Sequence, residues 1–194
     1  HEELMESMMD VFGLSDTPER IEIYDNSHIS GTNQVGALVV VGPEGFLKNQ
    51  YRKYNIKSDI EAGDDYAMMR EVFTRRFKRA LTEDPDRQSG TWPDLILVDG
   101  GKGQVSAATD VLNELNITDI PLFGVSKGPD RNAGREKFHH PDGRVFDLPH
   151  NDPSLYFIQR MRDESHRFAI GSHRAKRNKA TFTSPLDEIA GIGP

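Results

Sequence analysis

The sequence contains no cysteine. Disulfide bonds and thiolate metal sites are therefore excluded, and this composition fits a cytoplasmic protein. No stretch approaches the length of a membrane span, and no secretory signal, internal repeat or low-complexity segment is visible. We therefore expect a cytoplasmic location and no membrane partner.

The bulk composition is that of one soluble globular domain. The 194 residues are 36% apolar and 28% charged. The net charge of −7 argues against a nucleic-acid binder, since such domains are often basic. The charge is uneven, however, because residues 1–19 contain six acids and no Lys or Arg, whereas residues 167–179 contain five Lys or Arg and no acid. An acidic average can therefore conceal a basic surface.

The apolar periodicity predicts a mixed α/β fold. Strands are predicted at residues 20–27, 35–41, 47–57, 94–100 and 121–127. Helices are predicted at residues 64–81, at residues 103–115, and from residue 152 to about 171 or beyond. The first three strands have short connections and predict an antiparallel meander, and the last two enclose a helix in a parallel βαβ unit. We expect a mixed sheet with helices on both faces and a long C-terminal helix.

Two aspartates each end an apolar strand, Asp25 after residues 21–24 and Asp99 after residues 95–98. Side chains alternate faces along a strand, so each carboxylate shares a face with apolar residues. Two such carboxylates can stay ionised together if a divalent cation lies between them. The alternative is that each aspartate caps the turn that follows it.

A histidine on the long helix is placed to meet this sheet edge. The helix buries an apolar stripe made of Leu155, Ile158, Met161, Ser165, Phe168 and Ala169. His166 falls at the edge of the stripe beside Arg162, and imidazole is a competent ligand for Mn²⁺ and an acceptable one for Mg²⁺. Otherwise His166 is a boundary residue bonded to a backbone carbonyl.

Three further features are weaker candidates. Asp64 is a natural helix N-cap, and Asp65 lies near the apolar stripe of its own helix and could point toward the sheet. The glycine-rich run 100–104 follows Asp99, where Lys102 could steady a phosphate, although a tight strand-to-helix turn explains the run equally.

A basic segment near the end of the long helix is a candidate for DNA backbone contact without sequence readout. Its cations are Arg174, Lys176, Arg177 and Lys179. A solvated helix end is the alternative explanation.

Five segments carry a resemblance to a known family. They are Tyr24-Asp25-Asn26-Ser27-His28, Tyr51-Arg52-Lys53-Tyr54-Asn55-Ile56, Asp64-Asp65-Tyr66-Ala67-Met68-Met69-Arg70, Leu97-Val98-Asp99-Gly100-Gly101-Lys102-Gly103-Gln104 and Arg162-Asp163-Glu164-Ser165-His166-Arg167-Phe168-Ala169. In this order, over about residues 18–183, they resemble the C-terminal half of UvrC, the nuclease subunit of the bacterial UvrABC excision-repair system. Asn26 departs from the apolar residue expected there, on the opposite strand face from Asp25.

The resemblance implies an RNase H-like endonuclease domain that makes the 5′ incision beside a DNA lesion. The catalytic and metal-binding residues of the family fall on Asp25, Asp99 and His166, with Mg²⁺ or Mn²⁺ as cofactor. We expect Lys102 and Arg162 to neutralise charge on the scissile phosphate. The implied partners are damaged double-stranded DNA and, in the full-length protein, the UvrB–DNA complex.

The same reasoning predicts the domain organisation. Residues 1–17 are interpreted as the remnant of an upstream linker or helix, residues 18–183 as the nuclease domain, and residues 184–194 as the truncated start of a helix-hairpin-helix module. Two other functions remain open: a non-catalytic DNA-binding scaffold, and a nucleotide-binding enzyme that uses residues 100–104 as an anion loop. The missing Walker and dinucleotide glycine patterns argue against the second.

Overall fold

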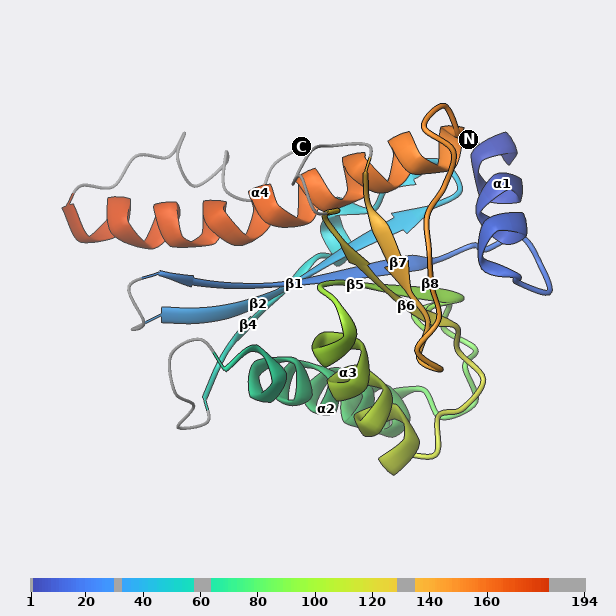
Figure 1. The fold of residues 1–194 in the computed structure, drawn as a ribbon. Coiled ribbons are helices and arrows are strands. Elements are labelled where there is room, and N and C mark those ends of the chain that lie inside the picture. The colour runs from blue at the N-terminus through green and yellow to red at the C-terminus, as the bar shows by residue number, and fades with distance from the viewer. Residues whose placement is uncertain (1, 30–32, 58–63, 129–134, 182–194) are drawn as a thin grey trace.

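The computed structural model describes residues 2–29, 33–57, 64–128 and 135–181, with only the backbone described for 27–29, 33 and 172–181. Its centre is one mixed sheet in the order β3-β2-β1-β5-β6-β7-β8, with β4 also paired to β2 (Figure 1). The strands are β1 (Ile21–Ile29), β2 (Asn33–Gly42), β3 (Gly45–Phe46), β4 (Arg52–Asn55), β5 (Leu95–Asp99), β6 (Leu122–Ser126), β7 (Lys137–His139) and β8 (Val145–Phe146). The helices are α1 (Glu2–Phe12), α2 (Asp65–Glu83), α3 (Lys102–Glu114) and α4 (Pro153–Thr181).

The predicted architecture is confirmed. β1 pairs antiparallel with β2, and β2 with β4, whereas β1, β5 and β6 run parallel. Figure 1 shows α4 on one face of the sheet and α2 with α3 on the other. Alternation along the strands supplies one apolar core to each helical layer, with Ile23 and Leu97 on the α4 face and Tyr24 and Val98 on the α2 face.

The long helix buries the stripe predicted for it. Leu155, Ile158, Met161, Ser165, Phe168 and Ala169 are all buried. The N-terminal helix α1 packs against the same layer, because Met5, Met8 and Phe12 are buried in the core beneath α4. Residues 2–12 therefore contribute to the packed interior of the molecule.

The third strand predicted over residues 47–57 is present only as β4, and its first part is wrong. A 3₁₀ turn at Lys48–Gln50 separates the two-residue β3 from β4. The turn lets Tyr51 face α4, where its ring meets Phe168 edge to face, with ring centroids 5.0 Å apart. Apolar alternation does not reveal this break, because contacts with α4, far along the chain, hold Tyr51 in place.

One charged group lies inside the α2-side core. Glu22 of β1 is completely buried and accepts hydrogen bonds from Arg20 at 2.9 Å, from Arg76 of α2 at 2.7 Å and from the Tyr24 hydroxyl. A buried carboxylate is tolerated only when it is paired in this way. The network therefore joins β1 to α2.

Candidate active site

The parallel pairing of β1 with β5 brings two acids together. Tyr24 is in register with Val98, so the next residues, Asp25 and Asp99, stand side by side at the carboxyl ends of these strands. Both lie on the α4 face, since Ile23 and Leu97, two residues earlier, belong to the core on that side.

Asp25 is the more enclosed of the two carboxylates. It is only 6% exposed, and its Oδ2 atom is buried without a hydrogen-bond partner. Burial first, and then the charge of Asp99, raise the pKa of Asp25 from 3.8 to about 7, while Arg162 acts in the opposite direction. The fold therefore holds an acid in a position where its negative charge is disfavoured.

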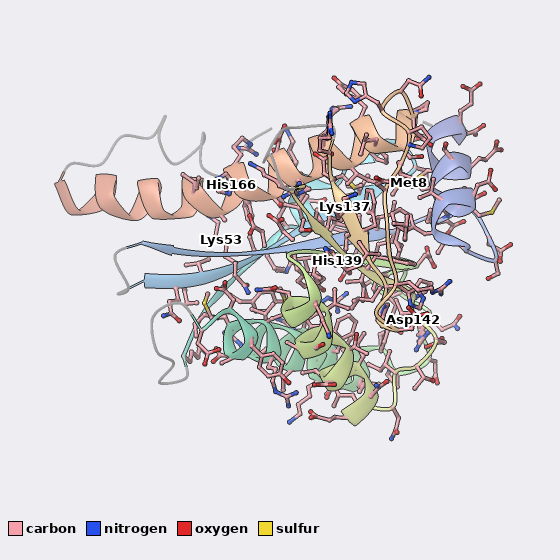
Figure 2. All side chains as sticks on the ribbon, in the orientation of Figure 1. Met8, Lys53, Lys137, His139, Asp142 and His166 are labelled. Carbon is pink, nitrogen blue, oxygen red and sulfur yellow. The ribbon has the colours of Figure 1, made fainter. Side chains whose placement is uncertain are left out.

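His166 lies over this carboxylate. Its Nδ1 atom is 3.5 Å from Asp25 Oδ2, and its side chain is 65% exposed. Figure 2 labels His166 on α4, above the strands of the sheet. Asp25 is thus approached by an imidazole from the helix and by a second carboxylate from the neighbouring strand.

Asp99 has a cationic neighbour. The Nη2 atom of Arg162, on α4, donates to Asp99 Oδ1 at 2.9 Å, and the arginine side chain is only 12% exposed. The guanidinium therefore offsets part of the negative charge that Asp25 and Asp99 bring together.

Comparison with known proteins decides the family. The family model described as the UvrC RNAse H endonuclease domain matches residues 9–170. The chain belongs to the UvrC family. Proteins named UvrABC system protein C are 64% identical to it over 188 residues in Sphingopyxis alaskensis and 62% identical over 191 residues in Rhodospirillum rubrum. These alignments cover 96% and 98% of this chain but only 29% and 30% of the relatives, so the chain spans about three tenths of their length.

Solved structures give more distant similarities. Human ENDOV is 20% identical with a TM-score of 0.42, covering 69% of this chain and 62% of that one. A Ciona intestinalis endonuclease V bound to inosine-containing DNA is 18% identical with a TM-score of 0.42, covering 66% and 54%. The RNase H-like assignment therefore rests on the UvrC family match. Within the described ranges, no helix has the length and apolar character needed to cross a bilayer.

The weaker site candidates of this UvrC domain lie at the starts of two helices, α2 and α3. Asp64 is the predicted N-cap of α2 and accepts from Ala67 N at 3.0 Å. Asp65 is half-buried in the first turn of α2, which packs on the face opposite α4. Lys102 is exposed at the start of α3, three residues after Asp99.

The basic segment lies on α4, which continues to Thr181, and the structure describes only its backbone. Arg174, Lys176, Arg177 and Lys179 therefore stay predicted DNA contacts. Residues 184–194, interpreted as the start of a helix-hairpin-helix module, lie outside the described residues.

Two residues near the site were missed by the sequence analysis. Glu136 is 3% exposed, and its Oε1 atom lies 3.8 Å from Arg162 Nη1. Tyr51 donates from its hydroxyl to Glu164 Oε2 at 2.7 Å, and Glu164 lies two residues before His166 on α4. The Tyr51 segment carried a signal, since it lies in a motif of the family resemblance, whereas Glu136 had none.

The donor set of this UvrC site suits a hard divalent cation. Two carboxylates and an imidazole are ligands that Mg²⁺ and Mn²⁺ accept, and the unpartnered Oδ2 of Asp25 is an acceptor without a donor. In the part of the chain that the structure describes, no three His, Asp or Glu side chains are grouped to hold a metal ion. Asp99 is instead paired with Arg162. The residues therefore fit the ion chemically, and binding would require a rearrangement at Asp99.

Proposed function

We propose that this chain is the divalent-metal-dependent endonuclease domain of a UvrC protein, which makes the 5′ incision beside a lesion during nucleotide excision repair. The observation that carries the proposal is the buried Asp25 carboxylate, flanked by Asp99 and His166, in a chain of this family. A site this polar at the carboxyl ends of two central strands does not stabilise the fold, because its acids repel one another.

The three residues have distinct roles in the proposal. Asp25 is the central ligand for Mg²⁺ or Mn²⁺, and Asp99 and His166 complete the protein ligands. When bound, the ions supply Lewis-acid chemistry for hydrolysis of a phosphodiester. Arg162 and Lys102 neutralise charge on the phosphate. Asp65 is a further candidate site residue.

The remaining parts of the proposal concern DNA and partners. The cations at residues 174–179 hold the duplex backbone without reading its sequence. Damaged double-stranded DNA is the substrate, and in the full-length protein the UvrB–DNA complex presents it. Residues 18–183 form the nuclease domain, with α1 packed into its core, and residues 184–194 begin a helix-hairpin-helix module.

Replacing Asp25 with Asn tests the function. In the full-length protein, with the complete UvrABC system and a duplex carrying one lesion, Asp25→Asn should lower 5′ incision by at least about 100-fold, the scale on which one preorganised electrostatic group contributes. Separate labels on the two ends of the damaged strand report the 5′ and 3′ cuts. The 3′ cut should persist, since the family makes it with a different nuclease.

Asp110→Asn, an exposed acid of α3, is the matched control and should incise normally. Full 5′ incision by Asp25→Asn would reject the assignment. If the unmodified protein also failed to bind Mn²⁺ in a titration, the non-catalytic scaffold would become the better explanation.

A further inference from the structure

One guanidinium serves two carboxylates beside the proposed catalytic centre. Arg162 donates through Nη2 to Asp99 Oδ1 at 2.9 Å, and its Nη1 lies 3.8 Å from Glu136 Oε1. The side chains of Asp99 and Glu136 are 22% and 3% exposed, respectively. Arg162 is therefore shared between a proposed metal ligand and a carboxylate with no assigned role.

Glu136 contacts a second residue of α4 besides Arg162. Its Oε2 accepts from Gln159 Nε2 at 3.3 Å, so both carboxylate oxygens face residues on consecutive turns of the same helix. A buried carboxylate costs several kcal/mol unless it is paired and hydrogen-bonded. Glu136 is thus fixed in place as a second acceptor for the Arg162 guanidinium.

The arginine is not locked onto either acid. A guanidinium pairs most strongly with a carboxylate through two parallel hydrogen bonds, whereas Arg162 offers one terminal nitrogen to each acid. Its Nε atom is buried without a hydrogen-bond partner. A small shift of the guanidinium can therefore move its charge from one carboxylate to the other.

Such a shift bears directly on Asp99. A guanidinium hydrogen-bonded to Asp99 competes with a cation for that oxygen, and a cation brought close to Arg162 is repelled. Moving an arginine away from a buried acid is costly unless another anion receives it. Glu136 supplies that anion near Nη1, the terminal nitrogen that does not donate to Asp99.

We propose that Glu136 is a positioning residue, which takes up the Arg162 guanidinium when Asp99 binds a divalent cation. This inference rests on the proposed function, because it assumes that Asp99 is a metal ligand. It assigns Glu136 no contact with substrate, and its whole effect passes through Arg162.

The test is direct Mn²⁺ binding to this chain, measured from the electron paramagnetic resonance signal of free Mn²⁺. Glu136→Gln keeps the shape of the side chain and removes its charge, and it should weaken Mn²⁺ binding by about 10- to 100-fold, as loss of a supporting group around a metal site does. Glu136→Asp should restore part of the affinity. Glu71→Gln, a carboxylate bonded to Arg75 on α2, is the matched control and should bind normally.

A double-mutant cycle separates positioning from direct ligation. With Arg162→Ala in the background, Glu136→Gln should have no further effect on Mn²⁺ affinity, because no guanidinium competes for Asp99. An equal loss of affinity in both backgrounds, or unchanged affinity of Glu136→Gln, overturns the proposal. Melting temperatures of all variants in EDTA report any loss of folding.

Mn²⁺ binding by Asp25→Asn distinguishes failure of the Glu136 proposal from failure of the proposed function. If the unmodified chain binds Mn²⁺, Asp25→Asn loses it and Glu136→Gln does not, only the role of Glu136 is rejected. If the unmodified chain and Asp25→Asn bind Mn²⁺ equally, or neither binds it, the metal site itself is rejected and the role of Glu136 with it.

Discussion

At the scale of single residues, strand alternation predicts where the two aspartates lie, but it does not predict which side chains contact them. Alternation places Asp25 and Asp99 on one face, and the structure has both strands supplying that face. The pairing of Arg162 with Asp99 could not be predicted, since Arg162 was expected to meet a phosphate. Glu136 gave no signal either, because contacts with α4 determine its burial.

The burial of Asp25 beside Asp99 predicts an unusual pH dependence of the free energy of unfolding. Its pKa is raised from 3.8 to about 7 by burial and by Asp99. Between these values the folded chain retains a proton that the unfolded chain releases, so without metal the free energy of unfolding should fall as pH rises through this window. Each unit of pKa difference corresponds to about 1.4 kcal/mol.

Urea unfolding of the chain in EDTA at pH 5 and pH 8 measures this dependence. Asp25→Asn cannot titrate and should lose most of the fall in stability, whereas Asp110→Asn should keep it. A variant Asp25→Asn that loses stability with pH as steeply as the unmodified chain would show that Asp25 is not the responsible group.

At the scale of elements, the long helix was predicted well and its attachment was not. The helical stripe follows from local periodicity, and every residue predicted for it is buried. One part of the attachment is Tyr51, which follows a 3₁₀ turn that the sequence analysis interpreted as part of a strand. Its hydroxyl bonds Glu164, a residue 113 positions away, and no local pattern encodes such a contact.

Removing the Tyr51 hydroxyl should loosen this attachment. Tyr51→Phe keeps the ring contact with Phe168 and removes the donor to Glu164. A hydrogen bond to a charged group contributes about 1.5–3 kcal/mol, so we expect a loss of this size in the free energy of unfolding, measured with urea. Amide exchange over residues 164–168 should also quicken. Tyr156→Phe, at a 66% exposed tyrosine of α4, should change neither quantity.

At the scale of the whole molecule, the mixed sheet follows from strand spacing alone. Short connections favour the antiparallel meander and a helical crossover favours parallel pairing, and both are present. Apolar residues recur at helical spacing in α1, but that spacing does not indicate which layer of the molecule they join. Burial of Met8 depends on the layer built by α4, which lies at the other end of the chain.

Because the chain carries a net charge of −7, DNA can bind only where cations are locally concentrated. If residues 174–179 hold the duplex, replacing Arg174, Lys176 and Arg177 with Ala should weaken binding at all sequences and reduce the slope of log affinity against log salt by about one for each lost phosphate contact. Fluorescence anisotropy with a labelled duplex across a salt series measures this slope.

The matched control removes the same charge elsewhere, through Ala at Lys78, Arg79 and Arg87, which are exposed around the far end of α2. Its slope should equal that of the unmodified chain. An unchanged slope in the first variant with a reduced slope in the second would put the duplex on the opposite side of the sheet.

The buried Glu22 has a consequence for how reliably the two aspartates meet. Sliding β1 by a single position along β5 would turn this carboxylate away from Arg76 of α2 and into the apolar layer beneath α4. That shift would bury the carboxylate without the Arg76 guanidinium, so a one-residue slip away from the register that sets Asp25 beside Asp99 is unfavourable. An ion pair remote from the candidate site thus helps to set the strand register on which that site depends.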